Sequence, residues 1–273
     1  MTAVEANISR SMPTRVWRRI ARYLTLELFL GIVSIGTIAV LWEFANPLGI
    51  PVLSNLPPLS EIVRTSQQLL TSDLYWDGWL LSIRRITSGF LLAQLIGVPI
   101  GLLMALHRAS FEAAFPIVEI LRPIPPVAWI PISILFWPTR ELSVIFIVFL
   151  GAFWIVLLNT IGGASHVDPN YRRAALSLGS TPRDMFWRII LPATIPSIVT
   201  GMAVGMGIAW EMVVAAEMVA GRTGLGYLLW QSLEINAIAQ CIICMISIGI
   251  AGFLSSEIIR LFGSFVAPWQ RMH

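Results

Sequence analysis

The sequence predicts an all-α fold, a polytopic membrane bundle of about six transmembrane helices. Hydrophobic residues make up 56% of the 273 positions and charged residues only 12%, about half the charged fraction of an ordinary globular domain. A soluble chain of this composition would expose large apolar patches. Apolar runs of the roughly 20 residues needed to cross a bilayer occur at 24–45, 86–106, 115–137, 142–162, 195–220 and 240–263.

The first 23 residues form a separate amphipathic segment ahead of a single membrane domain, 24–273. In the stretch 15–24, Val16, Trp17 and Ile20 fall on one side of a helix and arginines on the other, the pattern of a helix lying on a membrane surface. The run that follows lacks a small-x-small cleavage site. It is therefore expected to be an uncleaved first span rather than a secretory signal.

The third run, 115–137, is interrupted by prolines, which free backbone carbonyls inside a helix. Such a segment is expected to be broken and buried among other helices rather than exposed to lipid. The prolines are Pro116, Pro123, Pro125, Pro126 and Pro131.

The distribution of arginine predicts the orientation, because cytoplasmic segments of membrane proteins are enriched in basic residues. With six spans and both termini in the cytoplasm, twelve arginines fall on the cytoplasmic side and five outside, while Arg122 lies within a span. Segment 168–192 is then cytoplasmic.

Segment 168–192 has the signals of two short helices joined by a turn. Asp168 and Pro169 are suited to begin the first helix, and Gly179 is suited to end it in a left-handed conformation. Thr181, Pro182 and Asp184 then restart a helix with a capping-box pattern. Tyr171, Ala174, Ala175 and Leu178 form one small-to-apolar stripe on the first helix, and Met185, Phe186, Ile189 and Ile190 form the apolar face of the second.

On physical grounds alone, this hairpin could be a docking surface for another protein or a linker lying on the membrane. The spacing Ala174-Ala175-x-x-x-Gly179-x9-Ile189-x-Leu191-Pro192 resembles the "EAA" signature of the permease subunits of binding-protein-dependent ABC importers. Arg173 stands where that signature has a glutamate. The resemblance implies that the hairpin docks into a cytoplasmic ATPase, with Arg173, Ala174, Ala175, Leu178, Gly179, Ile189, Leu191 and Pro192 as the coupling residues.

Further stretches, at 56–65, 84–105, 121–137 and 215–232, are similar to the branch of that family that handles nitrate, sulfonates, taurine and bicarbonate. The resemblance implies the type I importer permease fold in a bacterial plasma membrane. It also implies a homodimer, two ATP-binding subunits that use ATP and Mg, and an external solute-binding protein.

Chemistry expected of an enzyme is absent from the sequence. The chain has no lysine and no GxxxxGK[ST] loop, so we expect it to bind no ATP itself, nor any other cofactor. It also has no HExxH or GxSxG motif, and its scattered arginines make no nucleic-acid-binding face. Cys241 and Cys244 are interpreted as buried apolar side chains rather than metal ligands. A secondary transporter is the main alternative, but the internal repeats typical of that class are not found.

Charged and aromatic residues within the spans are candidates for the solute path, since ionisable groups are costly there. Glu119 and Arg122, three residues apart, can also simply neutralise one another. Glu211 and Glu217 are about 120° apart around a helix, so both cannot face one narrow path. Gly201, Gly205 and Ala209 follow a small-xxx-small rhythm that favours close helix packing. The path candidates are Glu119, Arg122, Trp129, Trp154, Glu211 and Glu217.

Overall fold

A computed structural model of the chain describes residues 30–31, 33–34, 36–44 and 56–269. The chain divides into two compact units, Met1–Thr65 and Ser66–His273. The predicted amphipathic segment 1–23 and the beginning of the first predicted span lie outside the described residues.

In the first unit, residues 36–44 are helical and are joined to the start of α3 (Leu59–Leu70) by side-chain hydrogen bonds. The indole Nε1 of Trp42 donates to the carbonyl of Pro57 at 3.1 Å. The Glu43 carboxylate accepts the backbone N–H of Ser60 at 3.1 Å and its hydroxyl at 2.7 Å. These contacts fix the beginning of α3.

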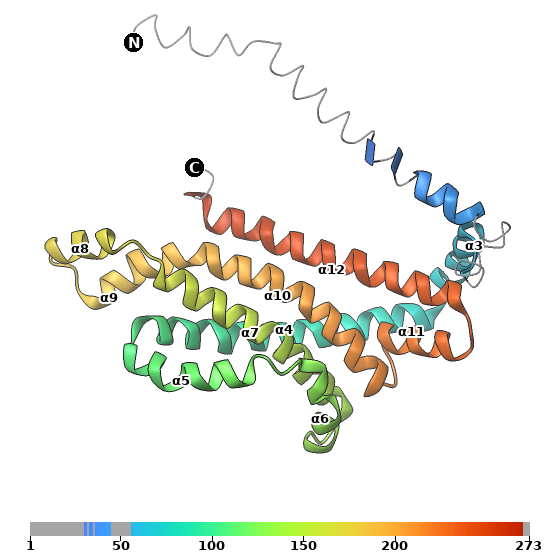
Figure 1. Ribbon diagram of the computed structural model, residues 1–273, viewed down its shortest axis with the longest axis horizontal. Helices are drawn as coiled ribbons and strands as arrows, with labels where there is room; N and C mark the ends of the chain where they lie inside the picture. Colours follow the sequence, from blue (N-terminus) through green and yellow to red (C-terminus); the bar gives the residue numbers. More distant parts are fainter. Residues whose placement is uncertain (1–29, 32, 35, 45–55, 270–273) are drawn as a thin grey trace, which may run out of the picture. The chain divides into compact units, whose positions relative to one another are not determined.

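The second unit is helical throughout its described length, apart from short connections (Figure 1). Its helices in chain order are α4 (Asp73–Leu106), α5 (Arg108–Leu121), α6 (Ile130–Phe136), α7 (Arg140–Ser165), α8 (Pro169–Ser177), α9 (Pro182–Met185), α10 (Leu191–Val219), α11 (Leu225–Glu234) and α12 (Ile238–Val266). A 3₁₀ turn, η1 (Pro126–Trp129), precedes α6, and a π turn, η2 (Phe186–Ile190), joins α9 to α10.

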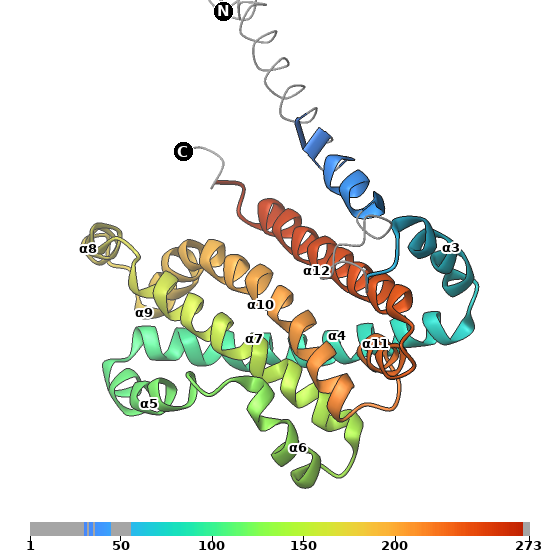
Figure 2. The ribbon, with the colours of Figure 1, turned by 45° about the vertical axis from the view of Figure 1, so that its right-hand side comes forward.

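The core of this unit is built on α7, which packs along both α4 and α10, while α12 packs along α10 (Figure 2). Val144, Ile147, Val148, Ala152 and Val156 of α7 have no exposed surface. Lipid tails are as apolar as these side chains, so close packing rather than removal from water holds such helices together. The hairpin α8–α9 lies at one end of the bundle and α11 at the other (Figures 1 and 2).

The predicted small-residue face of α10 is confirmed. A side chain at Gly201 would approach the Cβ of Asn159 on α7 to 2.8 Å, and one at Gly205 would come within 3.5 Å of the Ala152 carbonyl. Ala209 has no exposed surface. These positions therefore let α10 pack closely against α7. Cys241 and Cys244 are buried with free thiols, as expected of apolar side chains within a helix bundle.

The predicted break in the third apolar run is confirmed, and it divides that run into two helices. The predicted burial among other helices is not found within this chain, because Ile120, Leu135 and Phe136 are 71%, 88% and 77% exposed. The segments Arg108–Leu121 and Pro126–Phe136 meet at an angle of 84°. Pro123, Pro125 and Pro126 lie in or beside the bend, where missing N–H groups and fixed φ angles prevent helix continuation. The bent pair is either one broken span or a re-entrant loop.

Within the described residues, four helices are long and apolar enough to span a membrane, or up to five when the bent pair is counted as one span. The predicted span 86–106 begins too late, because α4 starts at Asp73. The apolar pattern is interrupted by Asp77, Arg84 and Arg85, yet the helix continues through them. Arg85 is 4% exposed, so one of these charges lies inside the bundle.

Candidate functional site

The hairpin begins each of its two helices with the predicted cap. The Asp168 carboxylate accepts the backbone N–H of Asn170 at 2.8 Å, and Pro169 occupies the first turn of α8. The Thr181 hydroxyl oxygen accepts the backbone N–H of Asp184 at 3.2 Å and donates its proton to the Asp184 carboxylate at 2.6 Å. Each cap satisfies a backbone donor that a helix start would otherwise leave unpaired.

The end of α8 is a Schellman motif, as the glycine at 179 predicts. Gly179 has a φ of +76°, the left-handed region in which residues other than glycine are strained. Its backbone N–H donates to the carbonyl of Leu176 at 3.0 Å, and that of Ser180 donates to Ala175 at 3.0 Å. This pair of bonds reverses the chain direction within two residues.

One face of the hairpin is packed against the rest of the second unit. Ala175, Met185 and Ile190 are buried together with Leu102 at the end of α4 and Ala164 at the end of α7. The apolar face predicted for the second helix is therefore confirmed. This packing fixes the root of the hairpin on the bundle.

The stripe predicted for the first helix is exposed at every member except Ala175. Ala175 is buried, but Ala174 is exposed, and Tyr171 and Leu178 are 63% and 85% exposed. Leu176 is 61% exposed on the same short helix. With only nine residues, α8 contacts the bundle along one narrow line, so the remaining apolar side chains face away from this chain.

The later part of the signature continues into α10. Ile189 and Leu191 pack against the buried root, while Arg173 is exposed on α8. Pro192 does not end a helix. It lies in the first turn of α10, where its missing N–H is tolerated. The preceding π turn keeps the chain helical between α9 and α10. In this turn the Leu191 N–H donates to the Phe186 carbonyl.

A cavity of about 770 Å³ opens beside the root of the hairpin, between the end of α7 and the start of α10. Asn159, His166 and Ser197 are among the polar side chains that line it. The Nδ1 atom of His166 lies 2.7 Å from the Gly162 carbonyl. With a proton on Nδ1, this ring nitrogen donates a hydrogen bond to the Gly162 carbonyl, and Nε2 is the ring nitrogen not used in that bond.

The candidates for the solute path lie on several different elements, from α5 to α10. Arg122 and Glu119 form a long ion pair of 3.8 Å, with both side chains roughly half exposed. Trp129 and Trp154 are half-buried, and Trp154 packs edge-on against its neighbour on α7. Glu211 is exposed on α10. Within the part of the chain that the structure describes, no group of three or more His, Cys, Asp or Glu residues could hold a metal ion.

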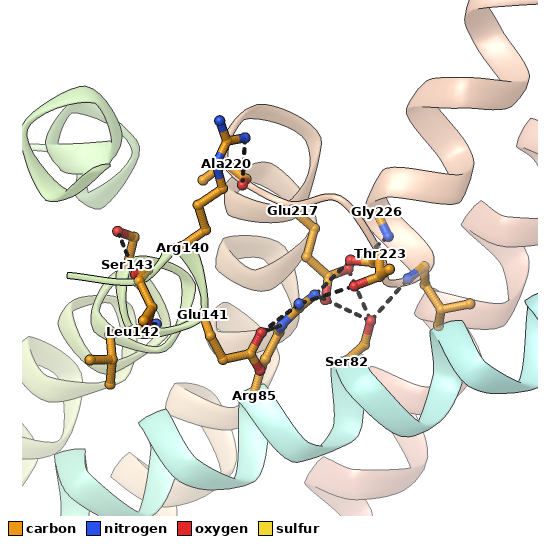
Figure 3. Close-up of polar contacts among 12 residues, drawn as sticks. Ser82, Arg85, Arg140, Glu141, Leu142, Ser143, Glu217, Ala220, Thr223 and Gly226 are labelled. Atoms are coloured by element: carbon orange, nitrogen blue, oxygen red, sulfur yellow. Dashed lines mark hydrogen bonds and ion pairs between the residues drawn. The ribbon is translucent and has the colours of Figure 1, made fainter. Parts of the chain in front are cut away.

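Glu217 differs from the other path candidates because it is fully enclosed by protein. Its carboxylate forms an ion pair of 2.8 Å with Arg85 on α4, and the Ser82 hydroxyl lies 2.8 and 2.9 Å from its two oxygens. The backbone N–H of Gly226 donates to it at 2.9 Å (Figure 3). A carboxylate satisfied in this way faces its own chain rather than an open path, which favours a structural role.

Arg85 links the same carboxylate to a second acid and to a turn. Its Nε and Nη2 atoms donate to one oxygen of Glu141 on α7, at 3.0 and 2.7 Å. Its Nη1 donates to the carbonyl of Thr223 at 2.6 Å, and Nη2 lies 3.3 Å from the Thr223 hydroxyl. Figure 3 shows the guanidinium between Glu141 and Glu217. The network therefore joins α4, α7, α10 and the turn between α10 and α11.

Sequence reasoning did not find this network, because Arg85 lies just before the predicted span 86–106 and is one of the five arginines assigned to the outside. The sequence nevertheless contains two features that indicate a buried ion pair at Glu217. Glu217 lies in an apolar run, where an acid needs a basic partner, and the stretch 217–226 contains glycines at 221, 224 and 226, which allow a chain to fold closely around a side chain.

Residues 97–272 match the family described as "Binding-protein-dependent transport system inner membrane component". A relative from Methanocaldococcus jannaschii, named as an ABC transporter permease protein, is 37% identical over 91% of this chain and 94% of its own length. The nitrate import permease protein NrtB of a Synechocystis species is 32% identical over 88% of this chain and 89% of its own length.

The bicarbonate transport system permease protein CmpB of a Synechocystis species is 30% identical over 84% of this chain and 85% of its own. Among solved structures, an amino acid ABC transporter shares the fold with a TM-score of 0.59, at 17% identity, over 74% of this chain and 96% of that one. The fold is therefore that of a type I ABC importer permease. The chain belongs to the binding-protein-dependent transport system inner membrane component family and is the permease subunit of an ABC importer.

Proposed function

We propose that this chain forms the membrane path of an importer for a small anionic or zwitterionic solute and couples to a separate ATPase through the hairpin 168–192. The importer would contain a homodimer of this chain, two ATP-binding subunits that use ATP and Mg, and an external solute-binding protein. Both termini and the hairpin would lie in the cytoplasm of a bacterium.

The observation that carries the coupling proposal is the construction of the hairpin. Its root is buried at Ala175, Met185 and Ile190, whereas Leu178 is exposed at its tip and Tyr171 is exposed in the first turn of α8. An exposed apolar tip on a capped, firmly seated hairpin is suited to a cleft in another protein. A linker lying loosely on a membrane would not need the same rigid support on its inner side.

The solute class rests on the relatives. NrtB is named as a nitrate permease and CmpB as a bicarbonate permease, and both solutes are small anions. The sequence similarities at 56–65, 84–105, 121–137 and 215–232 point to the same branch, which also includes sulfonates and taurine. Selectivity among these solutes would be shared with the external binding protein.

Co-purification from solubilised native membranes tests the proposal. A tagged copy of this chain is expected to retain a subunit that hydrolyses ATP, and cells lacking the chain are expected to lose uptake of labelled nitrate, bicarbonate or taurine. Native mass spectrometry of the complex should find two copies of this chain. Uptake by liposomes that contain this chain alone, driven by an ion gradient, would instead favour a secondary transporter.

A further inference from the structure

The buried ion-pair network lies far from the hairpin, at the opposite end of α10 (Figure 1). Glu217 follows Leu191, the first residue of α10, by a helical distance of roughly 39 Å at 1.5 Å per residue. No docking of an ATPase at the hairpin could involve these side chains directly. These side chains instead contact the segment that leads from α10 into α11.

Arg85 has no donor available for a solute. A guanidinium has five N–H groups, and here they make five contacts, two with Glu141, one with Glu217 and two with Thr223. Its side chain is only 5% exposed, and that of Glu217 is not exposed at all. Although the proposed solute is an anion, this buried arginine is therefore committed to its own chain.

The network instead organises the turn Gly221–Gly226, which leads from α10 into α11 and includes the first two residues of α11. The backbone N–H of Leu225 donates to the Ser82 hydroxyl at 3.0 Å, and that of Gly226 donates to Glu217 at 2.9 Å. Arg85 holds the carbonyl of Thr223 in the same turn. Three successive parts of the turn are thus bonded to side chains of α4 and α10.

The glycines of this turn show how closely it wraps the carboxylate. Gly224 has a φ of +116°, and a side chain there would collide with the carboxyl group of Glu217. A side chain at Gly226 would approach the Val214 carbonyl to 2.7 Å. The turn therefore keeps its course only with glycine at these positions and with Glu217 held in place.

We propose that Arg85 is a positioning residue for transport, which acts through Glu217 and Thr223. It holds the Gly221–Gly226 turn, and with it the start of α11, against α4, so that this end of the bundle moves as one body during the transport cycle. The inference rests on the proposed transport function, but the hold on the turn is a property of this chain alone and is measurable without any partner.

The test uses Arg85→Lys and Glu217→Gln in the full-length chain, reconstituted in nanodiscs. A lysine ammonium cannot contact Glu141, Glu217 and Thr223 together, and a neutral amide loses the attraction to Arg85. Hydrogen exchange at the amides of Leu225 and Gly226 is expected to become at least tenfold faster in both variants, with no change in the middle of α7. Glu112→Gln is the matched control, because its partner Arg108 is 91% exposed.

Uptake in cells is the second measurement. Both variants are expected to import solute at least tenfold more slowly while still co-purifying with the ATPase subunit. Unchanged exchange at Leu225 and Gly226, equal loss of protection along α7, or normal uptake with a loosened turn would each overturn the proposal.

If either variant fails to insert, Ser82→Ala provides the same test with a smaller change. It removes only the hydroxyl between Leu225 and Glu217, and a threefold faster exchange at Leu225 is expected; no change there would contradict the proposal. Loss of ATPase association by the unmodified chain would refute the proposed coupling function instead, so the two failures are distinguishable.

Discussion

Replacing Gly179 with valine should weaken binding of the ATPase subunit, because it disfavours the conformation of the hairpin turn. Gly179 has a φ of +76°, and an added Cβ would meet no atom of the chain within 4 Å. The free-energy cost of the substitution therefore comes from the backbone conformation and not from a steric clash with packed neighbours. A left-handed conformation costs a residue with a side chain about 1–2 kcal/mol, which is a factor of roughly 5–30 in an equilibrium.

This cost is small beside the stability of a folded domain, about 5–15 kcal/mol, so insertion and folding should survive in Gly179→Val. The competent hairpin would be populated roughly 5–30-fold less, and affinity for the ATPase subunit should fall by at least that factor. The measurement is binding of the purified ATPase subunit to the chain in nanodiscs, together with solute uptake in cells.

Two matched variants separate conformation from other effects. Gly179→Asn should retain most of the affinity, because asparagine adopts the left-handed conformation more readily than valine. Ser180→Ala should be mild, since Ser180 contributes a backbone N–H to the turn. Wild-type ATPase binding and uptake in Gly179→Val would refute the reasoning and leave the hairpin as a linker.

The remaining predictions concern the cap of α9, the close packing at Gly224 and the orientation of the chain in the membrane. Thr181→Ala removes the side-chain acceptor of the Asp184 N–H and should cost about 1 kcal/mol of local stability. Hydrogen exchange at the amide of Asp184 should become roughly fivefold faster, and unchanged exchange would mean that the cap contributes nothing. Gly224→Ala places a side chain against the Glu217 carboxyl and should lower the yield of folded protein, whereas Gly249→Ala, which meets nothing within 4 Å, should not; equal yields would contradict this packing. A tag within 71–77 should be labelled from outside intact cells and one within 168–184 should not, the reverse result being incompatible with the predicted orientation.

The hairpin could be predicted from sequence because its signals are local. Asp168, Gly179 and Thr181 each act on a backbone group within a few residues of their own position, and their side-chain chemistry is specific for helix ends. The same local reasoning predicted the break in the third apolar run. It did not predict the angle of 84°, which depends on the helices packed around the bend.

The ion-pair network could not be predicted in the same way. Arg85 and Glu217 are separated by 132 positions, and only the packing of α4 against α10 brings them together. Hydropathy treats a charge as the end of a span, although a charge with a buried partner can lie inside a bundle. The burial of Ala175 within the stripe on α8 could not be predicted for a related reason, because periodicity identifies a stripe but not which of its members packs against the bundle.

Photo-crosslinking from position 178 tests the central claim most directly, since the Leu178 side chain is 85% exposed at the tip of the hairpin. A photoreactive amino acid placed there in cells is predicted to form a covalent adduct with an ATP-hydrolysing subunit, whereas the same group at Leu95, 71% exposed on α4, should form none. Crosslinking from position 178 only to lipid, or equal crosslinking to the ATPase from both positions, would contradict the assignment of the hairpin as the coupling element.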